Sequence, residues 1–233
     1  MDSETSPHAA HARRIAFWLL CVLLLWSSAH ALNAWVLTMD ESTPGRRFAW
    51  WTGAKLVTWL LPTWLLLRSR GAASARWLGL TTGKGLGVAL LCSVAWIGFQ
   101  EAGLALHLPL FSRPPADLTL YSLAGSLLIA PCFEELMFRG AMLRTLRTAG
   151  YARSISILSS ALAFAMLHVP GWLARRGLDP FIAGAFASMT FFGVVAGWLA
   201  WRVPSLWGPI LFHWANNFWS TGALACLLSA KHS

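Results

Sequence analysis

Charge is scarce in this chain of 233 residues: only 12% are Asp, Glu, Lys or Arg, whereas soluble domains carry about a quarter. The longest polar stretches are the N-terminal arm and the region near 68–84, so no separate soluble domain is expected. The sequence also lacks internal repeats, low-complexity tracts and linkers. With 57% hydrophobic residues, the composition indicates a single integrated membrane domain.

Metal and nucleotide motifs are missing too. The four cysteines lie far apart without a C-x-x-C pair, which argues against a zinc ribbon and a redox motif. Cys132 stands beside two acids, but thiols in apolar segments are expected to act as small packing residues. The glycines of "TTGKGLG" at 81–87 lack the spacing and the preceding strand of a phosphate-binding loop. We interpret them as a flexible start to a helix.

Long apolar runs are what the chain has instead. A helix needs about 20 such residues to cross a bilayer, and we assign spans to 15–38, 48–67, 85–107, 118–143, 154–169, 181–201 and 205–229. The runs are continuously apolar, without the alternation of lipid-facing strands, which excludes a porin-like barrel. The predicted fold is all-α: a polytopic transmembrane helical bundle of about seven helices, or six to eight if a short one is re-entrant or split.

The basic residues predict the orientation of this bundle. If the N-terminus is cytoplasmic, eleven of them lie on that side: Arg13, Arg14, Arg68, Arg70, Arg76, Lys84, Arg139, Arg144, Arg147, Arg153 and Arg202. Six lie on the opposite side: Arg46, Arg47, Arg113, Arg175, Arg176 and Lys231. Cytoplasmic loops are enriched in Lys and Arg, so we expect the N-terminus to be cytoplasmic. Lys55 falls inside a span, and the sequence predicts no role for it.

We therefore interpret the net charge of +9 as a reflection of the membrane topology and as a source of attraction to anionic lipid headgroups. We do not interpret it as a nucleic-acid-binding surface. Residues 13–31 also have the basic start, apolar centre and A-x-A-like end of a secretory signal. The apolar pattern continues through 35–37, so we expect a retained first helix.

Two adjacent acids interrupt the fourth apolar run, in "PCFEELMFRG" at 131–140. An ionisable residue at membrane depth costs at least about 2.5–3.5 kcal/mol, so it normally has a partner and a purpose. Glu135 and Arg139 have the i, i+4 spacing and the order that favour a helix ion pair. Glu134 lies about 100° around the helix, away from that partner. Pro131 is expected to break or kink the helix, which would place Glu134 in a restarted first turn whose free amides favour an anion.

Two histidines are predicted to approach Glu134. The turn between the fourth and fifth spans is centred near Gly150, which Glu134 precedes by 16 residues and His168 follows by 18. In an antiparallel hairpin these side chains lie at nearly the same depth. His213 and Asn217 share one face of the last helix, and His213 is nine residues beyond the turn near Pro204.

Each of these residues also has an ordinary structural interpretation. A single histidine in an apolar helix is often a hydrogen-bonded packing residue, Asn217 could join two helices, and Phe164 belongs by default to the core. Their convergence from three helices favours a functional site inside the bundle.

The three motifs, in this order on separate apolar helices, resemble those of the CPBP family. "EELMFR" fits E-E-x-x-x-R, "FAMLH" fits F-x-x-x-H and "HWANN" fits H-x-x-x-N. That family contains the CAAX prenyl endopeptidases, bacteriocin-processing or immunity proteins (ABI family) and related intramembrane glutamic proteases. The resemblance covers residues 118–229 as a catalytic core, whereas residues 1–117 form N-terminal transmembrane helices without a recognised motif.

The resemblance implies a metal-independent glutamic endopeptidase that needs no cofactor. Its substrate would be a membrane-associated protein or peptide, lipidated or tail-anchored, cut near its C-terminus. Glu134 would activate water, His168 would position it or shuttle a proton, and His213 and Asn217 would stabilise the oxyanion. Glu135 and Arg139, with Phe164, would support the site, and the Glu135–Arg139 pair would orient a substrate carboxylate or backbone.

Two alternatives stay open. Glu134, His168 and His213 are also a set that could bind Zn²⁺, although the H-E-x-x-H helix of zinc proteases is absent. The same bundle could serve as a non-catalytic immunity factor, scaffold or transporter gate.

The expected partners are the lipid bilayer and a membrane-associated substrate, without nucleic acid. The short loops predict a multi-pass protein of a bacterial cytoplasmic membrane. Nothing in residues 1–117 identifies the substrate or the oligomeric state.

Overall fold

The computed structural model describes residues 7–38, 41–68, 75–107, 118–224 and 226, and these residues form seven continuous helical stretches without a strand. The first four stretches are α1 (Pro7–Leu32) with η1 (Asn33–Leu37); α2 (Pro44–Lys55), η3 (Leu56–Leu60) and α3 (Leu61–Arg68); α4 (Leu86–Ala105); and α5 (Leu120–Leu123), η4 (Ala124–Ile129), α6 (Ala130–Glu135), η5 (Leu136–Leu143) and α7 (Arg144–Thr148). The last three are α8 (Arg153–Arg176), α9 (Phe181–Arg202) and α10 (Trp207–Ser220). The segments labelled η are π-helical.

The predicted all-α bundle of about seven helices is confirmed. Three basic residues used to predict its orientation, Arg70, Arg113 and Lys231, lie outside the described residues. The end of the predicted span 205–229 lies outside them as well, except for residue 226.

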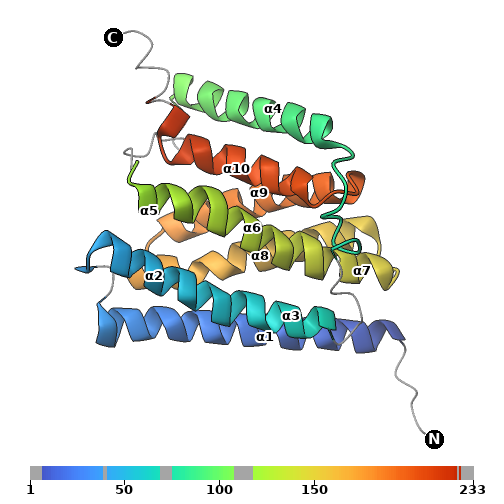
Figure 1. Ribbon diagram of the computed structural model, residues 1–233, viewed down its shortest axis with the longest axis horizontal. Helices are drawn as coiled ribbons and strands as arrows, with labels where there is room; N and C mark the ends of the chain where they lie inside the picture. Colours follow the sequence, from blue (N-terminus) through green and yellow to red (C-terminus); the bar gives the residue numbers. More distant parts are fainter. Residues whose placement is uncertain (1–6, 39–40, 69–74, 108–117, 225, 227–233) are drawn as a thin grey trace, which may run out of the picture.

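The seven stretches run back and forth along one direction (Figure 1). The long helix from α5 to α7 passes through the middle, with α8 and α9 behind it and α10 beside it (Figure 1). α1 and the stretch from α2 to α3 cover one flank, and α4 covers the other (Figure 1). The most extensive helix contacts are α8 with α9 and α4 with α10. The three helices that carry the sequence motifs are therefore central.

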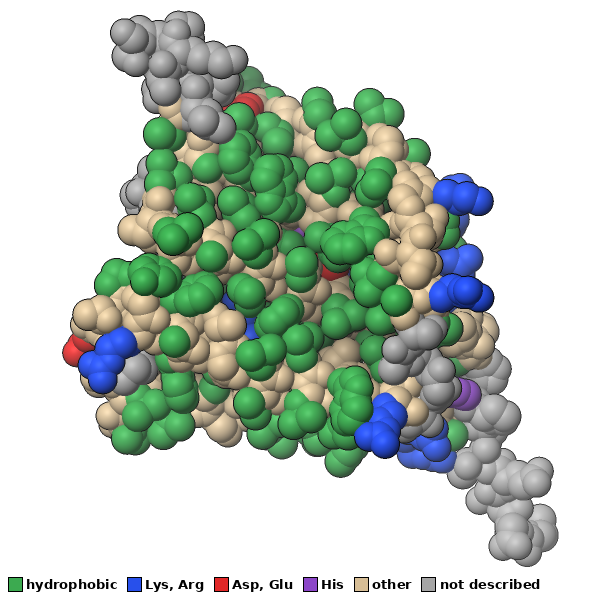
Figure 2. All heavy atoms as spheres, viewed as in Figure 1, with side chains coloured by type: hydrophobic (Ala, Val, Ile, Leu, Met, Phe, Trp, Pro, Cys, Tyr) green, Lys and Arg blue, Asp and Glu red, His purple; other side chains and the backbone are tan. Residues whose placement is uncertain are grey.

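Five stretches are long and apolar enough to cross a membrane: Ala10–Leu37, Leu86–Ala105, Leu120–Thr148, Arg153–Arg176 and Phe181–Arg202. The remaining two lie alongside them (Figure 1). α10 is only 14 residues long, and α2 contains Arg46, Arg47 and Lys55. Large apolar side chains cover the outer surface, as the green atoms of Figure 2 show. The chain is thus an integral, multi-pass membrane protein.

Pro131 does not break the fourth helix, so the expectation of a restarted helix was wrong. α6 continues from η4 with helical backbone angles at Ile129 (φ −72°, ψ −54°). The π-helical turns before Pro131 give the physical reason, because local widening accommodates a proline in a membrane helix. Glu134 therefore lies inside a continuous helix and not beside the free amides of a first turn.

Pro170 does not end the fifth helix either. α8 runs for 24 residues, from Arg153 to Arg176, whereas the predicted span stopped at residue 169. The additional turns, which contain Trp172 and Arg175, extend α8 to the end of the bundle where α2 begins (Figure 1).

A dense core fills the bundle around η5. Met137, Phe138 and Ala141 are fully buried, and Met142 and Leu143 are nearly so. We call these five residues the inner core. They lie between the paired acids of α6 and the basic helix α7.

Candidate active site

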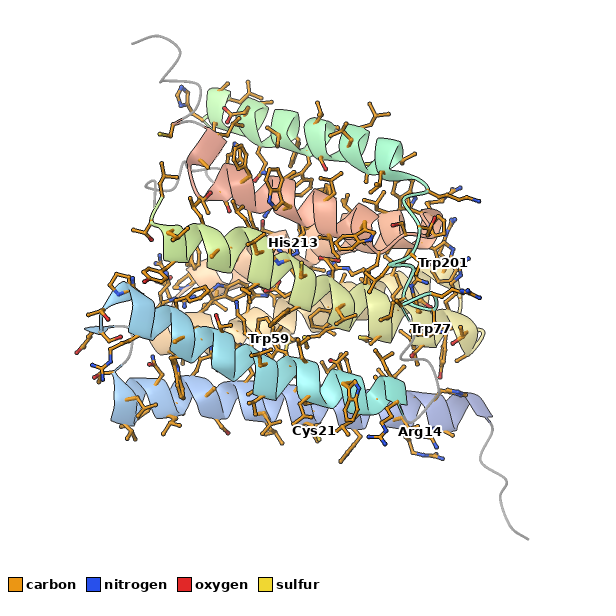
Figure 3. The ribbon with its side chains drawn as sticks, in the orientation of Figure 1. Arg14, Cys21, Trp59, Trp77, Trp201 and His213 are labelled. Carbon is orange, nitrogen blue, oxygen red and sulfur yellow. The ribbon has the colours of Figure 1, made fainter. Side chains whose placement is uncertain are left out.

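Glu134 faces two imidazole rings from neighbouring helices. Its Oε2 lies 3.9 Å from Nε2 of His168 on α8 and 3.8 Å from Nε2 of His213 on α10. The Glu134 side chain is only 6% exposed. Figure 3 shows His213 near the middle of the bundle's length, far from Arg14 and Trp201 at one end. The structure thus brings three predicted site residues together from three helices.

Each ring is oriented through its other nitrogen. Nδ1 of His168 lies 2.9 Å from the carbonyl oxygen of Phe164, which only accepts, so Nδ1 carries the hydrogen. Nδ1 of His213 lies 2.8 Å from Oε1 of Glu135, and an ionised carboxylate also only accepts. Both Nε2 atoms are therefore turned toward Glu134, and in a neutral ring each of them is an acceptor.

Glu135 binds two basic partners, Arg139 and His213, through one carboxylate oxygen. Its Oε1 accepts from Nη1 of Arg139 at 3.1 Å, so the predicted i, i+4 ion pair is present. The same oxygen accepts from His213 on α10, and Glu135 is fully buried. Sequence spacing predicted the first bond but not the second, because nothing local marks a contact across 78 residues.

Arg139 joins three helices and lies outside the cavity described below. Its Nη2 donates to the carbonyl oxygen of Gly193 on α9 at 3.1 Å. Its guanidinium stands 4.7 Å from the ring centre of Phe164 on α8, and the residue is fully buried. Phe164 in turn packs against the rings of His168 and His213, at 4.9 and 5.9 Å between centroids.

Asn217 lies one helical turn after His213. Its Nδ2 donates to the carbonyl oxygen of Ser126 at 2.7 Å, and its Oδ1 accepts from Asn216 at 3.1 Å. Asn216 accepts from the indole of Trp96 on α4 at 2.9 Å. The amide pair therefore ties α10 to η4 and α4, which is the helix-joining contact that the sequence left open.

A cavity of about 1260 Å³ surrounds this group. Glu134, Phe164, His168, His213 and Asn217 line it, whereas Glu135, Arg139 and Cys132 do not. Its volume exceeds the roughly 300–1,000 Å³ of typical small-molecule pockets, so it has room for a polypeptide segment.

The wall formed by α2 and η3 was not predicted from sequence. Trp51, Lys55 and Trp59 all line the cavity, and Nζ of Lys55 stands 5.0 Å from the Trp59 ring centre. Lys55 stands out in the sequence as a single charge within an apolar run, but the spacing of the surrounding residues does not indicate a partner for it.

The site residues and the distances between them can be compared with the ligands of a metal ion. No group of three His, Cys, Asp or Glu in the described part of the chain has the arrangement of a metal site. Ligands of a tetrahedral zinc ion stand about 2.0–2.2 Å from the metal and hence roughly 3.4 Å from one another. The Glu134–His168 and Glu134–His213 distances of 3.9 and 3.8 Å are wider.

Comparison with known proteins agrees with the motifs. Residues 116–219 match the family model described as type II CAAX prenyl endopeptidase Rce1-like. The match contains all seven predicted site residues and confirms the resemblance to the CPBP family. It supports a CAAX-type intramembrane endopeptidase in general and a membrane-associated protein or peptide as its partner. No curated protein and no solved structure matches the chain.

Proposed function

We propose that this protein is a glutamic intramembrane endopeptidase that hydrolyses a peptide bond near the C-terminus of a lipidated or tail-anchored substrate. The observation that carries the proposal is the position of Glu134 Oε2, within 4 Å of the Nε2 atoms of His168 and His213. Glu134 Oε2 and the Nε2 atom of a neutral His168 ring are acceptors, and one water can donate a hydrogen to each of them.

The distances are compatible with one water between the three groups. Polar atoms separated by 3.8 and 3.9 Å are too far apart for a direct hydrogen bond, and a water about 2.8 Å from each can bridge them. Glu134 takes a proton from this water while the oxygen attacks the peptide carbonyl carbon. His168 holds the water through Nε2, because its Nδ1 is committed to Phe164.

The negative charge then develops on the former carbonyl oxygen. In its protonated form His213 donates from Nε2, first to the oxygen of the water and then to this oxyanion, and the Glu135 carboxylate compensates the charge of the ring throughout. Asn217 has a second amide hydrogen besides the one given to Ser126 and is the further candidate donor. Glu134 passes its proton to the leaving nitrogen, the C–N bond breaks, and a carboxylate and an amine result.

The test is cleavage in membranes that contain the intact chain or Glu134→Gln. Mass spectrometry of C-terminal fragments should find products only with the intact chain, since a general base contributes about 10²–10⁴-fold. Glu41→Gln is the matched control, because Glu41 is an exposed acid before α2. Equal fragment patterns with and without Glu134 would contradict the proposal.

Complementation in cells separates this function from a non-catalytic scaffold. A scaffold depends on the buried Glu135–Arg139 pair and tolerates Glu134→Gln, whereas a protease tolerates neither change. Full complementation by Glu134→Gln alongside failure of Arg139→Ala would favour the scaffold.

We also propose that the protein resides in a bacterial cytoplasmic membrane with its N-terminus in the cytoplasm. The excess of Lys and Arg at one end of the bundle supports this orientation.

A further inference from the structure

The cavity extends from the middle of the bundle to one of its ends. Its lining includes the beginning of α2, the residue before α5, the last turn of α8, the first turn of α9 and the end of α10: Pro44, Thr119, Arg175, Phe181 and Ser220. These helix ends meet on the left side of Figure 1. We call this end the mouth.

The opposite end is closed and basic. The inner core separates Glu134 from α7, and its side chains are at most 4% exposed. Nine basic residues of the described chain belong to that end: Arg13, Arg14, Arg68, Arg76, Lys84, Arg144, Arg147, Arg153 and Arg202. Figure 2 shows blue side chains gathered there.

The mouth has a different charge. Four basic residues of the described chain lie there, Arg46, Arg47, Arg175 and Arg176, together with three acids, Glu41, Glu101 and Asp179. Basic residues near span ends concentrate on the cytoplasmic side of a membrane. The basic end is thus the cytoplasmic end, and the mouth lies across the bilayer from it.

We propose that the active-site cavity opens on the non-cytoplasmic face of the membrane. The substrate class that follows, given the proposed peptidase, is the membrane-anchored segment of an exported polypeptide. A cytoplasmic polypeptide would meet the closed basic end and the inner core.

The two ends of α8 provide a matched test. Arg175 borders the mouth and Arg153 begins the same helix at the basic end, and both are exposed. Each is replaced by cysteine in a chain whose Cys21, Cys92, Cys132 and Cys226 are changed to serine. Intact cells are treated with a membrane-impermeant maleimide, before and after permeabilisation.

Arg175→Cys should react in intact cells, and Arg153→Cys should react only after permeabilisation. The reverse pattern, or equal reaction of both in intact cells, would overturn the proposal. The readout is labelling and not cleavage, so a negative result here leaves the proposed peptidase function to its own test.

Lys55 carries a second, independent inference. It is a cation at membrane depth on the cavity wall, held against the Trp59 ring at 5.0 Å. Within the described residues no carboxylate lies within ion-pair distance of it, although Glu134 attracts it across the cavity. Such a charge is costly unless it serves a partner.

We infer that the Lys55 ammonium binds a carboxylate of the substrate, namely that of its free C-terminus. The inference rests on the proposed cleavage near the C-terminus. Arg139, the residue expected from sequence to orient a substrate carboxylate, is fully buried and bound to Glu135 and Gly193. Lys55 faces the cavity instead, on the same wall as Trp51 and Trp59.

The test compares one peptide substrate as its free acid and as its C-terminal amide. The intact chain should cleave the acid with a kcat/KM about ten- to hundredfold higher, the range for a hydrogen bond to a charged group. Lys55→Met should lower cleavage of the acid by about that factor more than it lowers cleavage of the amide, and Lys55→Arg should keep part of the preference.

Two results would overturn this inference. One is equal cleavage of acid and amide by the intact chain, and the other is an equal loss on both substrates in Lys55→Met. The second pattern would mean that Lys55 acts on Glu134 or on folding. If the intact chain cleaved neither substrate, the proposed function itself would fail.

Discussion

Glu135 has one carboxylate oxygen that accepts two hydrogen bonds and another, Oε2, that accepts none within the described residues. Arg139 likewise has an Nε without a partner there. Both residues are fully buried, so their mutual charge compensation is the main reason that either can remain ionised at this depth. The pair positions His213, because Oε1 of Glu135 accepts a hydrogen bond from its Nδ1.

Removing Arg139 should therefore destabilise the whole chain. Breaking one side of a buried ion pair costs about 3–5 kcal/mol, which lowers Tm by roughly 6–20 °C in a protein of this size. Thermal unfolding of Arg139→Met in detergent measures this, and Arg14→Met, at an exposed position, is the control. Glu135→Gln combined with Arg139→Met should lose less than the two single changes added together. Strict additivity would contradict the ion pair as the cause.

Glu134, His168 and His213 hold the proposed water, and they are also the residues that could bind Zn²⁺. Activity should survive exhaustive chelation, because Glu134 and the two histidines act on water directly in the proposed mechanism. Loss of activity on chelation, with recovery on adding Zn²⁺, would replace the water between Glu134, His168 and His213 by a metal-bound one.

At the scale of helices, the central stretch from α5 to α7 alternates between α and π geometry. The sequence predicted the helix itself from its apolar run, and predicted the convergence of Glu134 and His168 from a simple hairpin count. It failed at Pro131, because local sequence does not reveal how a membrane helix widens before a proline. It also ended the fifth helix at residue 169, whereas α8 continues to Arg176. It also missed the His213–Glu135 bond, since α10 and α6 meet only through tertiary packing.

The contact of α8 with α9 depends on a small residue at Gly193. A Cβ added there would lie 2.9 Å from the Cα of Ala161, which is closer than real contacts allow. The carbonyl oxygen of Gly193 also accepts a hydrogen bond from Arg139, so separation of α8 and α9 would disturb the site.

Gly193→Ala should consequently lower both Tm and activity. Gly98→Ala on α4 is the matched control, because a Cβ there meets nothing within 4 Å. We expect its Tm to stay or rise, since alanine favours a helix by up to about 1 kcal/mol. Equal Tm values for the two variants would show that the interface between α8 and α9 can accommodate a Cβ at Gly193 despite its short distance to Ala161.

At the scale of the whole molecule, the family match leaves out part of the site. Residues 116–219 contain every motif residue, yet Lys55 and Trp59 of the cavity wall lie before that region, and so does Trp96, which anchors Asn216. No residue in 1–115 belongs to a recognised motif, so their part in the site is visible only once the chain is folded.

A chain without residues 1–74 should therefore lose cleavage activity although it keeps Glu134, His168, His213 and Asn217. The cavity would lack the wall formed by α2 and η3 and would face lipid there. Adding residues 1–74 back as a separate polypeptide should restore part of the activity. Full activity of the shortened chain would mean that the first helices play no part in the reaction.

The inner core has a consequence for the proton gradient across the membrane. If the cavity admits water, as the proposed mechanism requires, only the part of the bundle between the cavity and the basic end remains to insulate against proton flow. Met137, Phe138 and Ala141, all without exposed surface, form that remaining insulation. In the proposed mechanism, the protein would thus bring water to a peptide bond within lipid without opening a path for protons across the membrane.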